Sequence, residues 1–196
     1  MNSATDRIIM GVDPGTSVLG YSMLQCPPDT APQILALGVI KLNKFQDHYV
    51  RLSKIYERAV SLIEEFRPDE LAIEAPFYAK NVQSMLKLGR AQGTVITAAL
   101  AHSIPIFEYA PRKIKLAVTG HGDASKDQVA HMLQTMFHMS QLPDYYDATD
   151  ALAAAVCHFF QKDLPAGAAP QKRQHTAPHG SWSDFIKNNP DRIVSP

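Results

Sequence analysis

Four acidic residues of this 196-residue chain stand beside apolar stretches, where carboxylates are costly to place without a compensating partner. Asp13 and Glu74 each directly follow a short apolar stretch that is typical of a buried strand. Asp147 and Asp150 lie three positions apart in an otherwise apolar segment, so on a helix they share one face. These four positions are therefore the first candidates for chemistry.

If the four carboxylates lie close together in space, their mutual repulsion indicates which chemistry they can support. Two like charges about 4 Å apart repel by roughly 4 kcal/mol at an effective dielectric constant near 20, so four carboxylates raise one another's pKa values or recruit cations. Carboxylate oxygens are typical ligands of the hard ions Mg²⁺ and Mn²⁺. Two such ions roughly 3.5–4 Å apart can hold the attacking and the leaving oxygen of a phosphodiester. The acids thus predict metal-assisted phosphoryl transfer, with two Mg²⁺ ions per site that Mn²⁺ can replace.

Each acid also has an ordinary structural explanation when it is taken alone. Asp13 begins Asp-Pro-Gly and can shape a turn, and Glu74 can be a solvated strand end. Asp147 can interact with the dipole of a helix N-terminus, and Asp150 can lie on a wet face. These alternatives stay open for single residues. They weaken for the set, because every one of the four borders an apolar element.

The surrounding pattern alternates between strands and helices, which predicts an α/β layered domain with a mixed sheet. Strands are expected at residues 8–12, 18–24, 34–42, 70–73 and 104–109. Helices are expected at residues 48–66, 84–102, 125–137 and 147–160. The first three strands favour two successive antiparallel hairpins.

Composition limits the class of protein. The 19 basic and 19 acidic residues cancel, so a nucleic-acid partner requires a local basic face rather than a basic total. We expect Cys26 and Cys157 to be buried reduced thiols in a cytoplasmic protein, and no stretch approaches the ~20 apolar residues that span a bilayer. Residues 1–163 form the expected domain, and the proline-rich residues 164–196 form an expected flexible tail.

Five motifs in fixed order resemble the RuvC family of crossover junction endodeoxyribonucleases, which have an RNase H-like fold. They cover about residues 7–160, and the set is far more specific than any single member. The motifs are Ile9–Tyr21, Ala72–Asn81, Leu86–Gly93, Phe107–Lys115 and Asp147–Ala153.

The resemblance implies that Asp13, Glu74, Asp147 and Asp150 are the catalytic and metal-binding acids. It implies a mixed five-stranded sheet flanked by helices, and a homodimer that nicks four-way (Holliday) junctions symmetrically during recombination and repair. The ends would carry a 5′-phosphate and a 3′-hydroxyl. It also implies the branch-migration proteins RuvA and RuvB as partners. The tail inherits nothing from it.

Residues 77–130 carry seven basic and three acidic side chains, a local excess that can neutralise DNA phosphates. Ordinary solvated lysines and arginines are the alternative for each. The resemblance singles out Lys115 and Lys126 as backbone contacts and makes Phe77 a base-stacking residue; without the resemblance, Phe77 is better explained as a core anchor. The full expected DNA-binding set is Phe77, Lys80, Arg112, Lys113, Lys115 and Lys126.

Gly89 and Gly93 lie four apart on an expected helix, where they permit close approach of another element. Internal packing and a contact between two copies of the chain are both open. Parts of the sequence also fit other functions. Gly11–Ser17 resembles the first phosphate loop of actin-like sugar kinases, which need a second domain and a second glycine-rich loop that are missing here. A non-catalytic junction-binding protein and an RNA-cutting nuclease of the same fold are further alternatives.

Overall fold

The structure is a computed structural model that describes residues 6–75 and 81–162, all within the first of the chain's two units, Met1–Pro165. The strands are β1 (Arg7–Asp13), β2 (Val18–Cys26), β3 (Gln33–Lys41), β4 (Glu70–Glu74) and β5 (Ile106–Tyr109). The helices are α1 (His48–Phe66), α2 (Val82–Ala101), α3 (Pro111–Thr119), α4 (Lys126–Met136) and α5 (Tyr146–Lys162).

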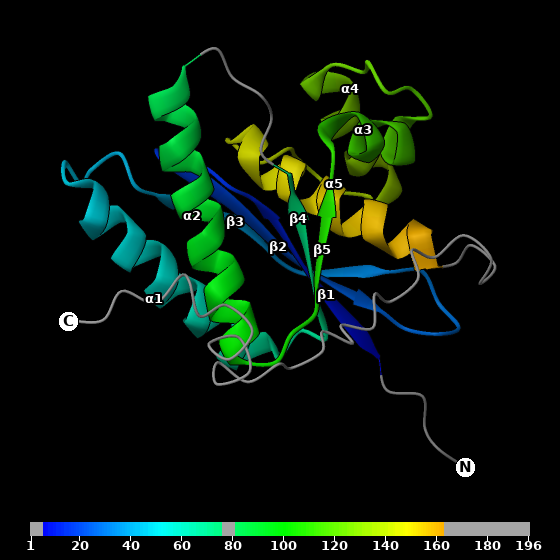
Figure 1. Cartoon of the computed structure of the whole chain (residues 1–196). Coiled ribbons are helices and arrows are strands. Elements are labelled where there is room, and N and C mark those ends of the chain that lie inside the picture. The colour runs from blue at the N-terminus through cyan, green and yellow to red at the C-terminus, as the bar shows by residue number, and fades with distance from the viewer. Residues whose placement is uncertain (1–5, 76–80, 163–196) are drawn as a thin grey trace, which may run out of the picture. The chain divides into compact units, whose positions relative to one another are not determined.

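The strands form one mixed sheet in the order β3-β2-β1-β4-β5 (Figure 1). Strands β1, β2 and β3 pair antiparallel, which confirms the two successive hairpins. Strand β4 pairs parallel with both β1 and β5; α1 leads from β3 into β4, and α2 connects β4 with β5. Parallel pairing brings the carboxyl ends of β1 and β4 to the same edge of the sheet.

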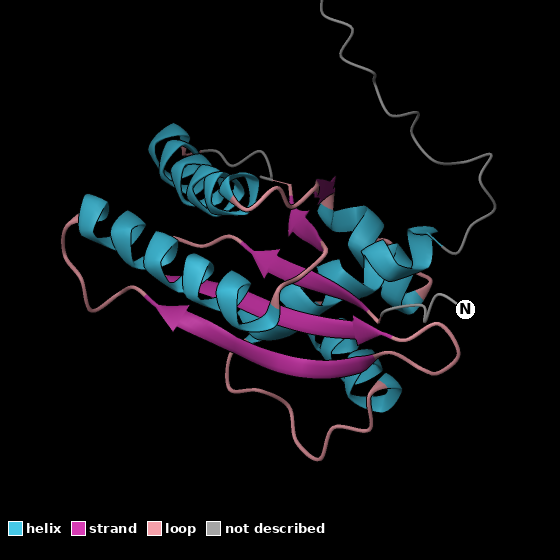
Figure 2. Ribbon diagram, turned by 90° about the horizontal axis from the view of Figure 1, so that it is seen from below, coloured by secondary structure: helices cyan, strands magenta, loops and turns pink. Residues whose placement is uncertain are grey.

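Helices cover both faces of the sheet (Figures 1 and 2). Side chains that alternate along β1 separate two cores, because successive strand residues point to opposite faces. Ile9 belongs to the core under α3, α4 and α5, and Met10 belongs to the core under α1 and α2. The mixed five-stranded sheet flanked by helices is therefore confirmed, and so is the burial of Cys26 and Cys157.

Helix α5 lies directly on β1 and β2 because small residues leave room for its backbone. A Cβ atom on Gly11 would stand 2.1 Å from the carbonyl oxygen of Ala151, and one on Gly20 would stand 1.8 Å from that of Asp147. The Ser22 hydroxyl donates a hydrogen bond of 3.1 Å to the same Ala151 carbonyl. The first turn of α5 is thus held against the end of β1.

The sequence did not single out α3. Its basic stretch after Pro111 resembles a loop, although proline at the first helical position and Gly120 in the left-handed conformation at the C-cap are both helix-end signals. Helix α4 lies within the expected range 125–137, and a capping box formed by Ser125 and Gln128 marks its start. In the part of the chain that the structure describes, no helix is long and apolar enough to cross a membrane. Phe77, Lys80 and residues 164–196 lie outside the described residues.

Candidate active site

Asp13 and Glu74 occupy the last positions of neighbouring parallel strands, β1 and β4. Val12 pairs with Ile73, so the two carboxylates emerge side by side although 61 positions separate them in sequence. Asp13 is also paired with Gly20 of β2, the glycine against which the Asp147 backbone packs. Because α5 packs closely on β2 at Gly20, Asp147 lies at the same end of the sheet as Asp13 and Glu74.

A small pocket forms where these elements meet. Its volume is about 80 Å³, room for roughly two or three water-sized groups. Three of the four predicted acids line it, and Asp147 lies just outside, near enough for its charge to act on Asp13. The lining residues are Asp13, Glu74, Pro111, Ile114, Lys115, Lys126, Val129, Asp150 and Ala153.

The acids disturb one another's ionisation. Burial, followed by the charges of Glu74 and Asp150, raises the pKa of Asp13 to about 8. Burial and the charge of Asp150 raise the pKa of Glu74 to about 7. The charge of Lys126 opposes both shifts but does not cancel them. Near neutral pH the ionised forms of both acids are therefore disfavoured, and added positive charge would favour them.

Lys126 supplies the nearest positive charge. Its ammonium group donates a hydrogen bond to Oδ2 of Asp150. Burial alone would lower the pKa of Lys126, but this bond and the fields of Asp150 and Asp13 raise it. Lys115 also lines the pocket and lowers the pKa of Glu74. The two predicted DNA contacts thus stand at the mouth of the acidic corner rather than on a distant face.

Among residues 6–75 and 81–162, no group of three His, Cys, Asp or Glu side chains is arranged to hold a metal ion as it stands. One oxygen of Asp150 accepts a hydrogen bond from Lys126 instead. The donor set nevertheless fits a hard cation, because it consists of carboxylate oxygens, and a bound cation would favour the ionised forms that burial and neighbouring charge disfavour at Asp13 and Glu74.

Size does not distinguish this pocket from the rest of the surface. Two larger hollows, of about 790 and 830 Å³, lie beside residues 136–143 and residues 119–135. The first is lined by no carboxylate and the second only by Asp123. The concentration of acids in the small pocket is what marks it as the candidate active site.

Two further predicted DNA contacts, Arg112 and Lys113, are on α3 and do not line the pocket. Arg112 and Asp123 are both exposed, and their nearest nitrogen and oxygen atoms are 3.7 Å apart. The Lys113 ammonium lies 5.2 Å from the centre of the Tyr109 ring. Sequence reasoning missed that Lys126 contacts Asp150, because a contact between residues 24 positions apart leaves no local pattern.

Comparisons with known proteins place the chain in a family. A sequence profile described as crossover junction endodeoxyribonuclease RuvC matches residues 9–158. The RuvC protein of Porphyromonas gingivalis is 55% identical over 193 residues, covering 97% of this chain and 99% of that protein. The RuvC protein of Bacteroides fragilis is 53% identical over 190 residues, covering 96% of each.

Solved structures agree. The structure of Thermus thermophilus RuvC in complex with a Holliday junction substrate has a TM-score of 0.74 and 29% identity, covering 80% of this chain and 94% of that one. The yeast mitochondrial Holliday junction resolvase Ydc2 has a TM-score of 0.56 at 15% identity, which indicates the shared fold. The sugar-kinase interpretation is thereby excluded, and the chain belongs to the RuvC family of crossover junction endodeoxyribonucleases.

Proposed function

We propose that this protein resolves four-way DNA junctions by metal-dependent nicking, with Asp13, Glu74, Asp147 and Asp150 as its catalytic acids. The observation that carries the site is the meeting of acids from β1, β4 and α5 at one corner of the sheet. The substrate rests on membership of the RuvC family and on the likeness to a RuvC structure that contains a Holliday junction.

Mg²⁺ is the proposed cofactor, with Mn²⁺ as a substitute and two ions per site. Bound by the four carboxylates, the ions would supply positive charge for the attacking and leaving oxygens of the phosphodiester. The chain's own residues prepare this corner. Lys126 holds Asp150, Lys115 favours the ionised form of Glu74, and burial keeps bulk water from screening their charges.

The DNA contacts follow from the same arrangement. Lys115 and Lys126 stand where a phosphate group must approach in order to reach the acids. Arg112 and Lys113 extend the basic surface along α3. Phe77 and Lys80, which lie outside the described residues, remain proposed contacts on the strength of the Ala72–Asn81 motif.

We propose a homodimer whose contact surface is an exposed stripe on α2, formed by Val82, Leu86, Gly89, Gly93 and Leu100. Val82, Leu86 and Leu100 are each more than half exposed, and a Cβ atom on Gly89 or Gly93 would meet nothing within 4 Å. The described part of the chain therefore does not pack on these glycines, and a second copy is the proposed occupant. At 3.6 residues per turn the five positions share one helix face.

We further propose residues 1–163 as the nuclease domain and 164–196 as a tail, since the family profile ends at residue 158. RuvA and RuvB as partners and the cytoplasm as location are proposed from family membership alone.

The first test is a nicking assay on a synthetic mobile four-way junction with Mg²⁺. The unaltered protein should nick the junction and spare both a linear duplex and an RNA–DNA hybrid. Asp13→Asn, Glu74→Gln and Asp150→Asn should each lower the nicking rate by at least about a hundredfold while junction binding is kept. Glu65→Gln, on the exposed surface of α1, is the matched control and should nick normally. Undiminished cutting by the three variants would remove the site assignment.

Thermal unfolding tests whether ionised Asp13 destabilises the folded protein. Because its pKa is raised on folding, its contribution to stability is full below the ordinary value of 3.8 and is lost as the pH rises through about 8. In EDTA, Asp13→Asn should therefore melt above the unaltered protein at pH 8.5, by about 3 °C or more, and the difference should shrink toward pH 5. Mg²⁺ should raise the melting temperature of the unaltered protein more than that of the variant. Equal melting temperatures at both pH values would contradict this account.

Salt dependence tests Lys115 as a phosphate contact. Lys115→Ala should weaken junction binding and reduce the slope of log K against log salt by about 0.9, the value for one phosphate contact. Lys54→Ala is the control, because Lys54 lies on α1 and is paired with Glu57. A slope equal to that of the unaltered protein, measured by fluorescence anisotropy, would rule out this contact.

Light scattering after gel filtration tests the dimer. The unaltered protein should have twice the 21.6 kDa mass of one chain, and Gly93→Glu should shift it to the monomer because it places a charge in the α2 stripe. Gln83→Glu adds the same charge to an exposed position of α2 outside the stripe, and should leave the dimer intact. A Gly93→Glu dimer of unchanged affinity would exclude this surface.

A further inference from the structure

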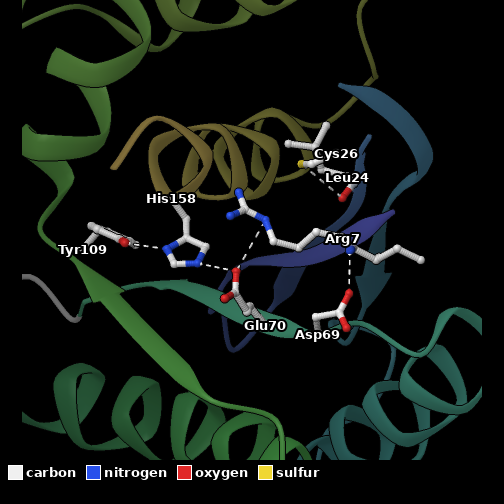
Figure 3. A network of polar contacts seen from close by, with 8 residues as sticks. Arg7, Leu24, Cys26, Asp69, Glu70, Tyr109 and His158 are labelled. Atoms are coloured by element: carbon white, nitrogen blue, oxygen red, sulfur yellow. Dashed lines mark hydrogen bonds and ion pairs between the residues drawn. The ribbon is translucent and has the colours of Figure 1, made fainter. Parts of the chain in front are cut away.

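A buried chain of hydrogen bonds lies at the opposite end of α5 from the proposed catalytic acids (Figure 3). His158 is 1% exposed, Glu70 is 5% exposed and Tyr109 is 7% exposed. The Tyr109 hydroxyl is 2.6 Å from Nδ1 of His158, and Nε2 of His158 is 2.9 Å from Oε2 of Glu70. Nε of Arg7 lies 3.7 Å from the same Glu70 oxygen.

The donors and acceptors fit only one arrangement of a neutral imidazole. An ionised Glu70 can only accept, so Nε2 of His158 carries the hydrogen and donates it. Nδ1 is then an acceptor and receives the hydroxyl hydrogen of Tyr109. Burial and the charge of Arg7 lower the pKa of His158 to about 4, and burial raises the pKa of Tyr109 to about 12. Both groups therefore keep these forms at neutral pH.

Two of the three residues lie on elements that carry the acids, β4 and α5, and the third lies on β5, which pairs with β4. Glu70 is the first residue of β4, whose last residue is Glu74. Tyr109 is paired with Glu74 across the sheet, and its carbonyl accepts a 2.9 Å hydrogen bond from Ala75. His158 follows Asp150 on α5 by eight residues, which is about 12 Å along the helix axis.

Elsewhere α5 packs closely on the sheet, largely through small residues. The contacts at Gly11 and Gly20 are tight but not directional, and the Ser22 hydroxyl donates a hydrogen bond to the Ala151 carbonyl. Hydrogen bonds are directional, and leaving a buried donor or acceptor unpaired is costly. A slide or rotation of α5 would break both bonds of His158, and it would also carry Asp147 and Asp150 away from Asp13 and Glu74.

We propose that His158, held between Tyr109 and Glu70, is a positioning residue that fixes the register of α5 and thereby sets the spacing of the four acids. It contacts neither DNA nor metal and acts through the helix. The inference rests on the proposed function of the acids, and it adds a determinant of metal affinity that lies outside the site.

The test compares His158→Leu with Val156→Ala. Val156 is as buried as His158 on the same helix but takes no part in the hydrogen-bonded chain, so its variant reports loss of packing alone. Mn²⁺ binding is followed by electron paramagnetic resonance, and nicking is followed as a function of Mg²⁺ concentration. Circular dichroism sets a temperature at which every protein is folded.

His158→Leu should weaken Mn²⁺ binding, and raise the Mg²⁺ concentration for half-maximal nicking, by about tenfold or more. Val156→Ala should change neither. Metal affinity in His158→Leu equal to that of Val156→Ala would overturn the proposal, since the histidine would then serve stability only.

Tyr109→Phe keeps the ring and removes only the hydroxyl, so it serves if His158→Leu does not fold. It should weaken Mn²⁺ binding by about threefold or more, and unchanged binding would again overturn the proposal. Glu70→Gln keeps an acceptor for Nε2 of His158 and should retain near-normal metal affinity, whereas Glu70→Leu should not. If the unaltered protein fails to nick junctions, the proposed function fails, but the Mn²⁺ titrations still decide the role of His158.

Discussion

Mutual repulsion among carboxylates is the constraint on which this structure depends. Asp13, Glu74 and Asp150 share a small pocket in which water is too scarce to screen their charges. Burial and then the charges of the neighbouring carboxylates raise the pKa values of Asp13 and Glu74, so the fold alone does not stabilise the ionised forms of both acids. Placing these acids together therefore lowers the stability of the folded protein, as is common at sites that bind a ligand of opposite charge.

The rest of the domain provides the force that holds the acids together against this repulsion. Parallel pairing of β1 with β4 fixes two of them through backbone hydrogen bonds, and the seat of α5 on Gly11 and Gly20 fixes the others. A bulkier residue at either glycine would lift the helix. The His158 chain adds two buried hydrogen bonds to a contact that is made largely by small residues and by the Ser22–Ala151 hydrogen bond.

Most strands and helices, and the four candidate acids, could be predicted from the sequence because local patterns of residues indicate them. Short apolar stretches predicted the strands, and the spacing of Asp147 and Asp150 predicted that they share one helix face. Ser125-Lys-Asp-Gln has the sequence of a capping box, a local signal that marks the start of α4. Helix α3 was not predicted because the charged residues after Pro111 obscure its short apolar pattern. Ile114 and Val118 form the buried face of this helix.

Contacts between distant positions could not be predicted in the same way. The Lys126–Asp150 bond and the Tyr109–His158–Glu70 chain join residues 24 to 88 positions apart, so no window of the sequence contains both partners. The motifs could suggest that these elements meet, but the identity of each partner depends on strand order and helix register. Those properties emerge only when the whole sheet is assembled.

The acids and the lysines of the pocket come from different layers of the molecule. The acids sit on strand ends and on the helix that is pressed against the sheet, whereas Lys115 and Lys126 sit on α3 and α4, which pack on α5. The proposed catalytic geometry is therefore set by a hydrogen-bonded frame, whereas the proposed DNA contacts lie on an outer layer of helices. Lys126 joins the two layers through its bond to Asp150, so a substitution that displaces α4 would be transmitted to the acids.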